Sequence, residues 1–301
     1  MAGRESQIVL GLDPDPAALW AGSGPEPGEG SPAERAGAAV LGHCRALIDA
    51  TAEACVAVKL QLACFERLGA PGWSALEAVA AHARARGLLV IADGKRGDIS
   101  VSAAAYAQAL MGSIETPFGT VRGLGADLVT VNPLMGRDAV EPFVSVARDV
   151  GAGVLVLVRT SNPGAADVED LGLEGGEALW ERVAAIVNEL GSSGVGDAGL
   201  SDVGAVVGVT VPGHLVRARE LMGSATFLLP GVGAQGGRVE DLAPAFAPGR
   251  AGGLVSASRS IANAHLSTGG EPASAARAEA ERLRETAWAL SEGVPMGVGR
   301  N

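Results

Sequence analysis

Aromatic side chains are scarce in this chain of 301 residues, at 3% of the total, although hydrophobic residues together make up 48%. The core must therefore be built from aliphatic side chains, and their number suffices for one sizeable domain. Cationic residues are also few, since 23 Lys and Arg face 34 Asp and Glu, for a net charge of -11. Such a surface repels nucleic acid and anionic membranes, so we expect neither as a partner. A phosphorylated small molecule needs only a local cationic pocket.

Cysteine and histidine are too sparse to suggest a disulfide framework or a metal centre. The three cysteines (Cys44, Cys55 and Cys64) are odd in number and lack C-x-x-C spacing, so we expect reduced thiols in a cytoplasmic protein. The four histidines show no paired metal-ligand spacing, so no metal site is expected. No apolar run reaches about 18 residues and the first residues lack a signal-type apolar segment, so we expect no membrane span or secretion signal.

Short runs rich in Val, Leu and Ile recur along the chain, with amphipathic segments such as 33–54 and 74–87 between them. Continuous apolar character, without in-and-out alternation, indicates parallel strands buried on both faces. Eight such alternations predict an α/β fold, a single (β/α)8 TIM barrel over residues 1–301, with a C-terminal helix packed on the barrel. The predicted strands are residues 8–13, 55–61, 88–95, 128–134, 154–161, 203–210, 227–233 and 253–259.

Four longer segments rich in Gly, Pro and Ser interrupt this alternation. Those at 14–32, 112–125 and 162–176 are predicted to leave the carboxyl ends of the first, third and fifth strands, the second of them after a short helix. The segment 191–202 precedes the sixth strand and is expected on the opposite face. No domain boundary is apparent.

Polar residues gather at the carboxyl ends of the predicted strands. In a (β/α)8 barrel these ends converge on one mouth, where the active sites of this fold lie. The residues concerned are Asp13, Lys59, Asp93, Lys95, Asp98, Asn132, Arg159, Thr160, Ser161, Ser258 and Arg259.

Asp93 and Lys95 are two residues apart, so in an extended strand both side chains point to the same side, toward the barrel axis. With Lys59 from the neighbouring strand and Asp98 just beyond, they predict a mutually compensated ionic network. One interpretation is an ammonium directed at an atom that becomes negative during a reaction. The alternative is a structural salt-bridge cluster.

A G-x-G-x-x-G pattern at Gly231, Gly233 and Gly236 follows the seventh strand. A dinucleotide site would need a helix directly afterwards and an acidic residue at the next strand end, where Arg259 stands instead. Loops after strands seven and eight commonly bind phosphate in these barrels, through backbone amides and a cation. We therefore expect a phosphorylated substrate and metal-free chemistry at the lysine, either decarboxylation or isomerisation.

The segment "DGKRGDI", residues 93–99, resembles the D-x-K-x-x-D-I signature of the orotidine 5′-phosphate decarboxylase family, and its longer bacterial branch in particular. Similar motifs follow in order along the chain: "GLDPDP", "AVKLQLACFERLG", "TVNPLMG", "TSNPGA", "PGVGAQGG" and "SRSI". The resemblance implies a TIM barrel that converts orotidine 5′-monophosphate to uridine 5′-monophosphate and CO2. It also implies a homodimer and no metal or organic cofactor.

The resemblance further implies a role for each matching residue. Lys95 would protonate C6 as CO2 leaves, Asp93 would lie beside the substrate carboxylate, and Asp98 would reach into the site of a partner subunit. The remaining matches imply substrate contacts: Asp13 and Lys59 to the ribose, Ser161 to the pyrimidine, Gln235 and Arg259 to the phosphate, with Asn132 and Gly236 also at the site.

Two positions depart from the usual family pattern. Ser102 stands where the shorter members usually have Thr, and the hydroxyl is retained. Ser258 precedes Arg259 where Gly is common, which affects how closely the backbone approaches a phosphate.

Three other functions are also compatible with the sequence. A sugar-phosphate decarboxylase or aldolase of the same suprafamily would use a metal. A non-catalytic nucleotide-binding barrel would bind without turnover, and a pyridine-nucleotide enzyme would use the glycine-rich loop.

Overall fold

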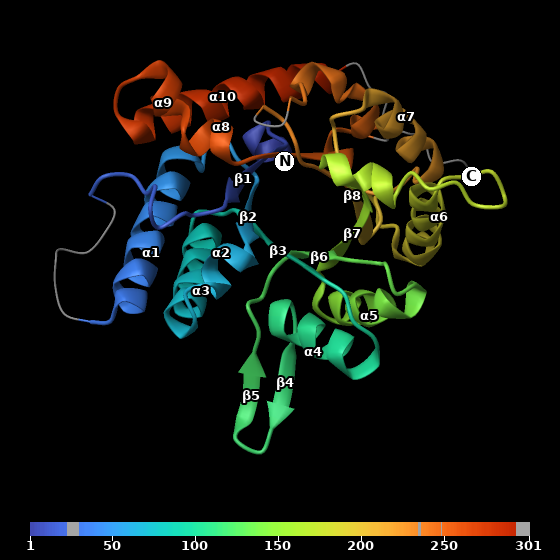
Figure 1. The fold of residues 1–301 in the computed structure, drawn as a ribbon, viewed down its shortest axis with the longest axis horizontal. Helices are drawn as coiled ribbons and strands as arrows, with labels where there is room; N and C mark the ends of the chain where they lie inside the picture. The colour runs from blue at the N-terminus through green and yellow to red at the C-terminus, as the bar shows by residue number, and fades with distance from the viewer. Residues whose placement is uncertain (23–29, 234–235, 248, 293–301) are drawn as a thin grey trace.

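Eight parallel strands close into a barrel in the computed structural model, which describes residues 1–22, 30–233, 236–247 and 249–292 (Figure 1). The order around the barrel is β1–β10–β9–β8–β7–β6–β3–β2, and every neighbouring pair is parallel. The strands are β1 (Ile8–Leu12), β2 (Ala57–Gln61), β3 (Leu89–Arg96), β6 (Leu128–Val131), β7 (Gly153–Arg159), β8 (Val203–Val207), β9 (Phe227–Leu229) and β10 (Gly253–Ala257).

All eight predicted strands are therefore confirmed, and so is the TIM-barrel fold. Most predicted runs extend past the observed carboxyl ends, because their last residues turn into the loops at the mouth.

Helices surround the barrel on its outside (Figure 1). The longest begins at a capping box, in which Ser31 and Glu34 each accept a hydrogen bond from the other's backbone amide. The helices are α1 (Pro32–Thr51), α2 (Leu62–Glu66), α3 (Ala70–Ala85), α4 (Ser100–Leu110), α5 (Glu141–Val150), α6 (Leu179–Gly191), α7 (Pro212–Leu221), α8 (Arg259–Ala262), α9 (Ala264–Thr268) and α10 (Pro272–Leu290).

The strict alternation of strand and helix fails between β9 and β10. In the described part of this connection the chain forms short 3-10 helices, at Val239–Asp241, Ala243–Phe246 and Arg250–Gly252, in place of an α-helix.

The segment 112–125 follows a short helix after the third strand, as predicted, but the prediction missed a hairpin and placed the segment at the wrong end of the barrel. Part of this segment is an antiparallel hairpin of β4 (Ser113–Thr116) and β5 (Gly119–Arg122). It also follows the carboxyl end of α4 and leads into the amino end of β6, so it does not lie at the mouth. Figure 1 shows it projecting outward beyond α4. Gly119, at φ +111°, permits the turn.

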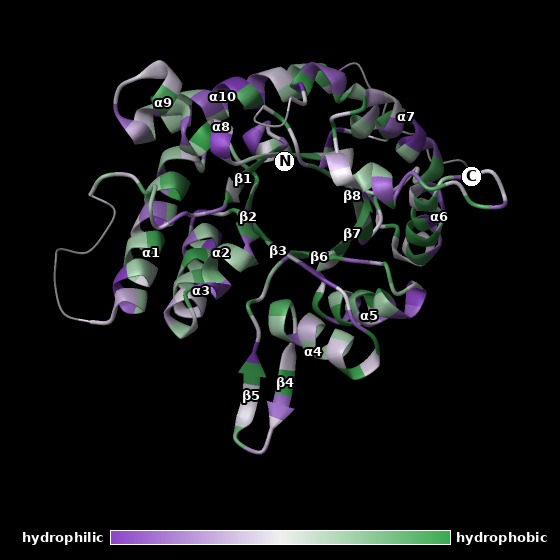
Figure 2. Cartoon of the chain, in the orientation of Figure 1, coloured by the Kyte–Doolittle hydropathy of each residue, from purple (hydrophilic) through white to green (hydrophobic). Residues whose placement is uncertain are grey.

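The hydrophobic core has two layers, one inside the barrel and one between the strands and helices. Successive residues of β3 illustrate the division, since Ile91 points into the barrel whereas Val90 and Ala92 pack under the helices. Figure 2 shows hydrophobic residues on the strands and polar residues on many outer helix positions. The barrel interior is thus filled with aliphatic side chains below the mouth.

The expected C-terminal closing helix is α10, which packs against α1, α8 and α9. Its buried residues, Ala276, Ala280, Leu283 and Ala287, recur at helical spacing and form one apolar face. None of the helices in the described residues combines the length and apolar character needed to cross a membrane.

Candidate active site

A cavity of about 530 Å³ opens at the carboxyl ends of the barrel strands. The two lysines and two aspartates come from β2, β3 and the residue directly after β1, whereas the apolar side chains and a glycine-containing loop come from β7, β8 and β9. The lining residues are Asp13, Lys59, Gln61, Asp93, Lys95, Thr130, Leu157, Thr160, Ser161, Asn162, Glu169, Val206, Leu228, Pro230, Gly231, Val232, Ser256, Ser258 and Arg259.

The ionic cluster centres on Asp93, which is only 3% exposed. Its Oδ2 accepts a hydrogen bond from Lys59 Nζ at 2.6 Å, and its Oδ1 accepts one from Lys95 Nζ at 2.6 Å. Lys59 Nζ also lies 3.7 Å from Asp13 Oδ1. Two ammonium groups thus face two carboxylates, as the spacing in the sequence predicted for Lys59, Asp93 and Lys95.

The two lysines differ in exposure, and this difference suits different tasks. The Lys59 side chain is 8% exposed and is enclosed by carboxylates, whereas the Lys95 side chain is 43% exposed and reaches the open cavity. These are the only two lysines in the 301 residues, because every other basic side chain is arginine or histidine.

Neighbouring opposite charges keep Asp93 and Lys59 ionised despite their burial. Burial alone would raise the pKa of Asp93, but the charges and hydrogen bonds of Lys59 and Lys95 outweigh it and lower the pKa to about 2. Burial would likewise lower the pKa of Lys59, but Asp93 and Asp13 outweigh it and raise that pKa above its usual value. Asp93 is therefore an anion at neutral pH.

On the opposite wall lie the backbone of Gly231 and Val232 and the side chains of Ser258 and Arg259. Arg259 is exposed and is the first residue of α8, one residue after Ser258, which directly follows β10. The Ser258 side chain occupies space beside Gly11 of β1, where a Cβ would lie 1.8 Å from Ser258 Oγ, so that only glycine fits. The loop and the cation expected to bind an anion are therefore in the same cavity as the lysines.

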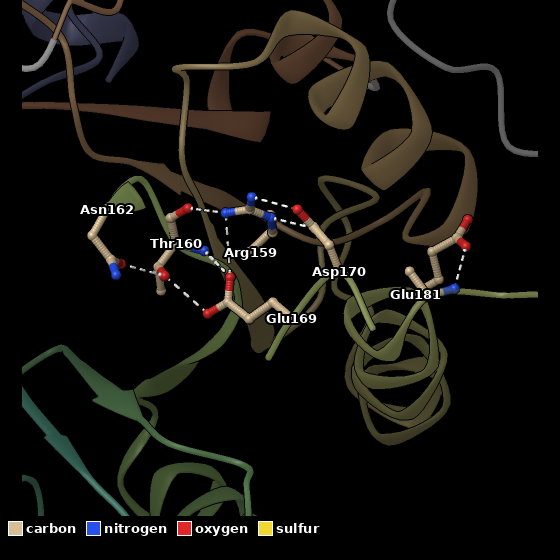
Figure 3. A network of polar contacts seen from close by, with 7 residues as sticks. Arg159, Thr160, Asn162, Glu169, Asp170 and Glu181 are labelled. Carbon is tan, nitrogen blue, oxygen red and sulfur yellow. Dashed lines mark hydrogen bonds and ion pairs between the residues drawn. The ribbon is translucent and has the colours of Figure 1, made fainter. Parts of the chain in front are cut away.

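The loop after β7 is held by Arg159, whose side chain is 9% exposed (Figure 3). Its Nε and Nη2 donate to the two carboxylate oxygens of Asp170 at 2.8 and 2.9 Å, and its Nη1 donates to the Thr160 carbonyl at 2.5 Å. Glu169 accepts a hydrogen bond from the Thr160 amide at 2.8 Å. The two ends of the loop are thereby tied together, which places residues 160–162 on the cavity wall.

Several predicted site residues do not line this cavity in the described chain. Asp98 accepts a hydrogen bond from the Ile99 amide and lies outside the ionic cluster, so a four-member network within one chain is not formed. Ser102 is exposed on α4, and the Asn132 side chain accepts a hydrogen bond from the Leu134 amide in its own loop.

The two remaining predictions fall on the loop after β9. Gly236 is exposed, with φ +88°, at a turn in which its amide donates to the Gly233 carbonyl. Gln235 lies outside the described residues.

Five polar side chains of the cavity were not predicted from the sequence: Gln61, Thr130, Asn162, Glu169 and Ser256. Gln61 lies in β2 and Ser256 in β10. That their side chains face the cavity becomes apparent only once the inward-facing positions of each strand are known. The scarcity of lysine is a signal that the sequence does carry, since both lysines prove to be in the cavity.

Together these features define the class of the protein: a (β/α)8 barrel whose mouth holds a lysine–aspartate cluster and an arginine in one cavity. Comparison with known proteins specifies the family. The model of the orotidine 5′-phosphate decarboxylase / HUMPS family matches residues 6–278, and the chain belongs to this family.

Relatives of high identity support the assignment. The chain is 46% identical over 240 residues to the orotidine 5′-phosphate decarboxylase of Deinococcus radiodurans, with 79% of this chain and 81% of the relative covered. It is 42% identical over 267 residues to that of Rhodopirellula baltica, with 86% and 84% covered.

Among solved structures, the OMP decarboxylase of Leishmania donovani is 31% identical, with a TM-score of 0.72 and 96% of each chain covered. A putative orotidine 5′-phosphate decarboxylase of Streptomyces avermitilis is 30% identical, with a TM-score of 0.76 and coverages of 96% and 92%. The barrel is thus shared with this family over nearly the whole chain.

The lowered pKa of Asp93 predicts a pH-dependent contribution to stability. Because the folded-state pKa is about 2, below the ordinary 3.8, ionised Asp93 stabilises the fold above about pH 4 and loses this effect between about pH 4 and 2. In urea unfolding, wild type should exceed Asp93→Asn in free energy of unfolding at pH 6. The difference should shrink by roughly 1 kcal/mol per pH unit below pH 4. The prediction is contradicted if the difference in free energy of unfolding between wild type and Asp93→Asn stays constant from pH 6 to 3. It is also contradicted if the exposed control Asp197→Asn shows the same difference and the same pH dependence.

Proposed function

We propose that this chain converts orotidine 5′-monophosphate to uridine 5′-monophosphate and CO2, with Lys95 as the proton donor to C6. Membership in the family and the names of its relatives support the decarboxylase activity. The observation that carries the residue assignment is that Asp93, Lys95 and Arg259 line one cavity. The product places the enzyme in pyrimidine biosynthesis, and we expect it in the cytoplasm.

The reaction requires stabilisation of negative charge at C6. When the bond between C6 and the carboxyl group breaks, its electron pair stays on C6, and the nearby ammonium of Lys95 stabilises this charge electrostatically. A proton then passes from Lys95 Nζ to C6, and Lys95 is reprotonated from solvent. Asp93 directs the ammonium, because its Oδ1 holds Lys95 Nζ at 2.6 Å.

The phosphate would bind at the other side of the cavity. Arg259 supplies a cation, and the loop that begins at Gly231 supplies backbone groups, in the region where barrels of this type often bind phosphate. Gln235 would add an amide contact. Binding energy from this remote group is then available to position the pyrimidine at Lys95.

The middle of the nucleotide would contact three further residues. Lys59 contacts both Asp93 and Asp13. Asp13 would accept hydrogen bonds from the ribose hydroxyls, and Lys59 would donate to them. Ser161, on the loop held by Arg159, would contact the pyrimidine, and the apolar side chains Leu157 and Val206 would form part of the floor beneath it.

The alternative functions are less well supported. A sugar-phosphate decarboxylase or aldolase is not favoured, because the relatives at 42% and 46% identity are named orotidine 5′-phosphate decarboxylases. A non-catalytic nucleotide-binding barrel would not need an exposed ammonium held by a buried carboxylate. A dinucleotide site at Gly231–Gly236 is disfavoured because a three-residue 3-10 helix, Val239–Asp241, follows the loop.

A homodimer would give Asp98 a function that it lacks within one chain. Asp98 lies outside the cavity of its own barrel and is followed by Ile99 and Val101, whose side chains are exposed, the latter at 82%. Leu134 and Met135, in the loop after β6, are also exposed large apolar side chains. A second copy of the chain covering these residues would bring Asp98, with Ser102 on the adjoining helix, to the partner's cavity.

Lys95→Ala is predicted to abolish decarboxylation, with a loss of more than about 10³-fold in kcat, because the variant lacks the ammonium at the reacting carbon. Uridine 5′-monophosphate should still bind, because Arg259 is retained. The assay follows the loss of substrate absorbance in the presence of a chelator, with Arg282→Ala on α10 as the control. Turnover near the wild-type rate by the Lys95 variant would refute the assignment.

Asp98→Asn and Lys95→Ala, each impaired alone, are predicted to complement each other when mixed. A mixed dimer has one site with both native residues, so random exchange of subunits should restore about a quarter of the wild-type activity. Mixing must follow reversible dissociation, and size-exclusion chromatography reports the oligomeric state. Activity of the mixture equal to the mean of the separate variants would show that Asp98 serves its own chain or has no role.

A further inference from the structure

Lys95 has an unusual backbone conformation for a residue with a side chain. Its φ is +47°, in the left-handed region that favours glycine. The pairing of β3 with β6 shifts register at this point, with Ala92 opposite Val129 and Arg96 opposite Val131. Three residues of β3, numbers 93–95, therefore lie opposite a single residue of β6. A conformation of this kind persists only where the surroundings hold it.

The single residue of β6 opposite this bulge is Thr130, which is 1% exposed. Its Oγ1 accepts a hydrogen bond from the backbone amide of Lys95 at 2.9 Å and donates one to Asp93 Oδ1 at 2.9 Å. The same Asp93 oxygen accepts the hydrogen bond from Lys95 Nζ. One hydroxyl thus connects the backbone of Lys95 with the carboxylate that holds its ammonium.

Packing alone does not explain a threonine at this position. Val129 and Val131 point outward under the helices, while Leu128 packs with the aliphatic core inside the barrel. Thr130 points inward like Leu128, but at the level of the cavity. Valine has nearly the same shape, yet it would leave the Lys95 amide without its acceptor and Asp93 without one of its donors.

We propose that Thr130 is a positioning residue for the decarboxylation, which fixes the direction of the Lys95 ammonium by holding the β3 bulge and Asp93 together. The inference rests on the proposed role of Lys95 as proton donor. Thr130 acts through Lys95 and Asp93, so its loss should affect the reaction step more than the binding of the nucleotide.

Kinetics of Thr130→Val and Thr130→Ser test this role. Thr130→Val should lower kcat on the order of 10²-fold, because small displacements of a catalytic group have effects of this size, while KM changes little. Thr130→Ser retains the hydroxyl and should recover most of kcat. Equal loss in both variants would mean that the methyl group and its packing matter, and would overturn the proposal.

The two lysines of the chain allow a direct test that does not depend on activity. Protein labelled with ¹⁵N-lysine shows two backbone amide signals, from Lys59 and Lys95. In Thr130→Val the Lys95 signal should shift, and its amide hydrogen should exchange with solvent about tenfold faster or more. The Lys59 amide, in the ladder of β2, should be unaffected and serves as the internal control.

The kinetic and exchange measurements distinguish failure of the proposed decarboxylase function from failure of the positioning role of Thr130. If wild type does not decarboxylate orotidine 5′-monophosphate, the proposed function fails, whereas the amide signals still report whether Thr130 holds Lys95. If the Lys95 amide of wild type exchanges freely, or is unchanged in Thr130→Val, the positioning role is refuted. The same conclusion follows if both lysine amides lose protection together, because that indicates general destabilisation. The wild-type exchange measurement remains decisive even if Thr130→Val fails to fold.

Discussion

One buried carboxylate, Asp93, organises the mouth of this barrel. It is held by two ammonium groups and a hydroxyl that come from β2, from β3 itself and from β6, three strands that are adjacent in the closed sheet. Removing any one partner would leave a buried charge partly uncompensated, which is costly in a poorly solvated site. The adjacency of these three strands in the barrel therefore creates the arrangement that presents Lys95 to the cavity.

Much of the fold could be predicted, because the sequence patterns that indicate it lie within short stretches of consecutive residues. Continuous apolar runs mark strands buried on both faces, and the change to polar residues at their ends marks the mouth. The Asp93–Lys95 spacing and the neighbouring Lys59 were sufficient to predict the core of the ionic cluster. The phosphate side was recognisable from Gly231 and Arg259, which the structure places in the same cavity.

The remaining features depend on contacts between distant residues, which the sequence does not display. Thr130 acquires its role only through the register shift between β3 and β6. Asn132 was expected at the site, but a hydrogen bond within its own loop turns it away. Asp98 lies outside its own cavity because the chain turns into α4 directly after it. The hairpin at 113–122 was missed because its strands have only four residues each.

We propose that one cavity holds a nucleotide with its phosphate at Arg259 and C6 of its pyrimidine at Lys95. A crystal structure of the protein with uridine 5′-monophosphate tests this claim most directly. We expect phosphate oxygens within hydrogen-bond distance of the Arg259 guanidinium and C6 about 3–3.5 Å from Lys95 Nζ, a distance suited to proton transfer. A nucleotide bound in the reverse orientation, or with C6 remote from Lys95, would contradict it.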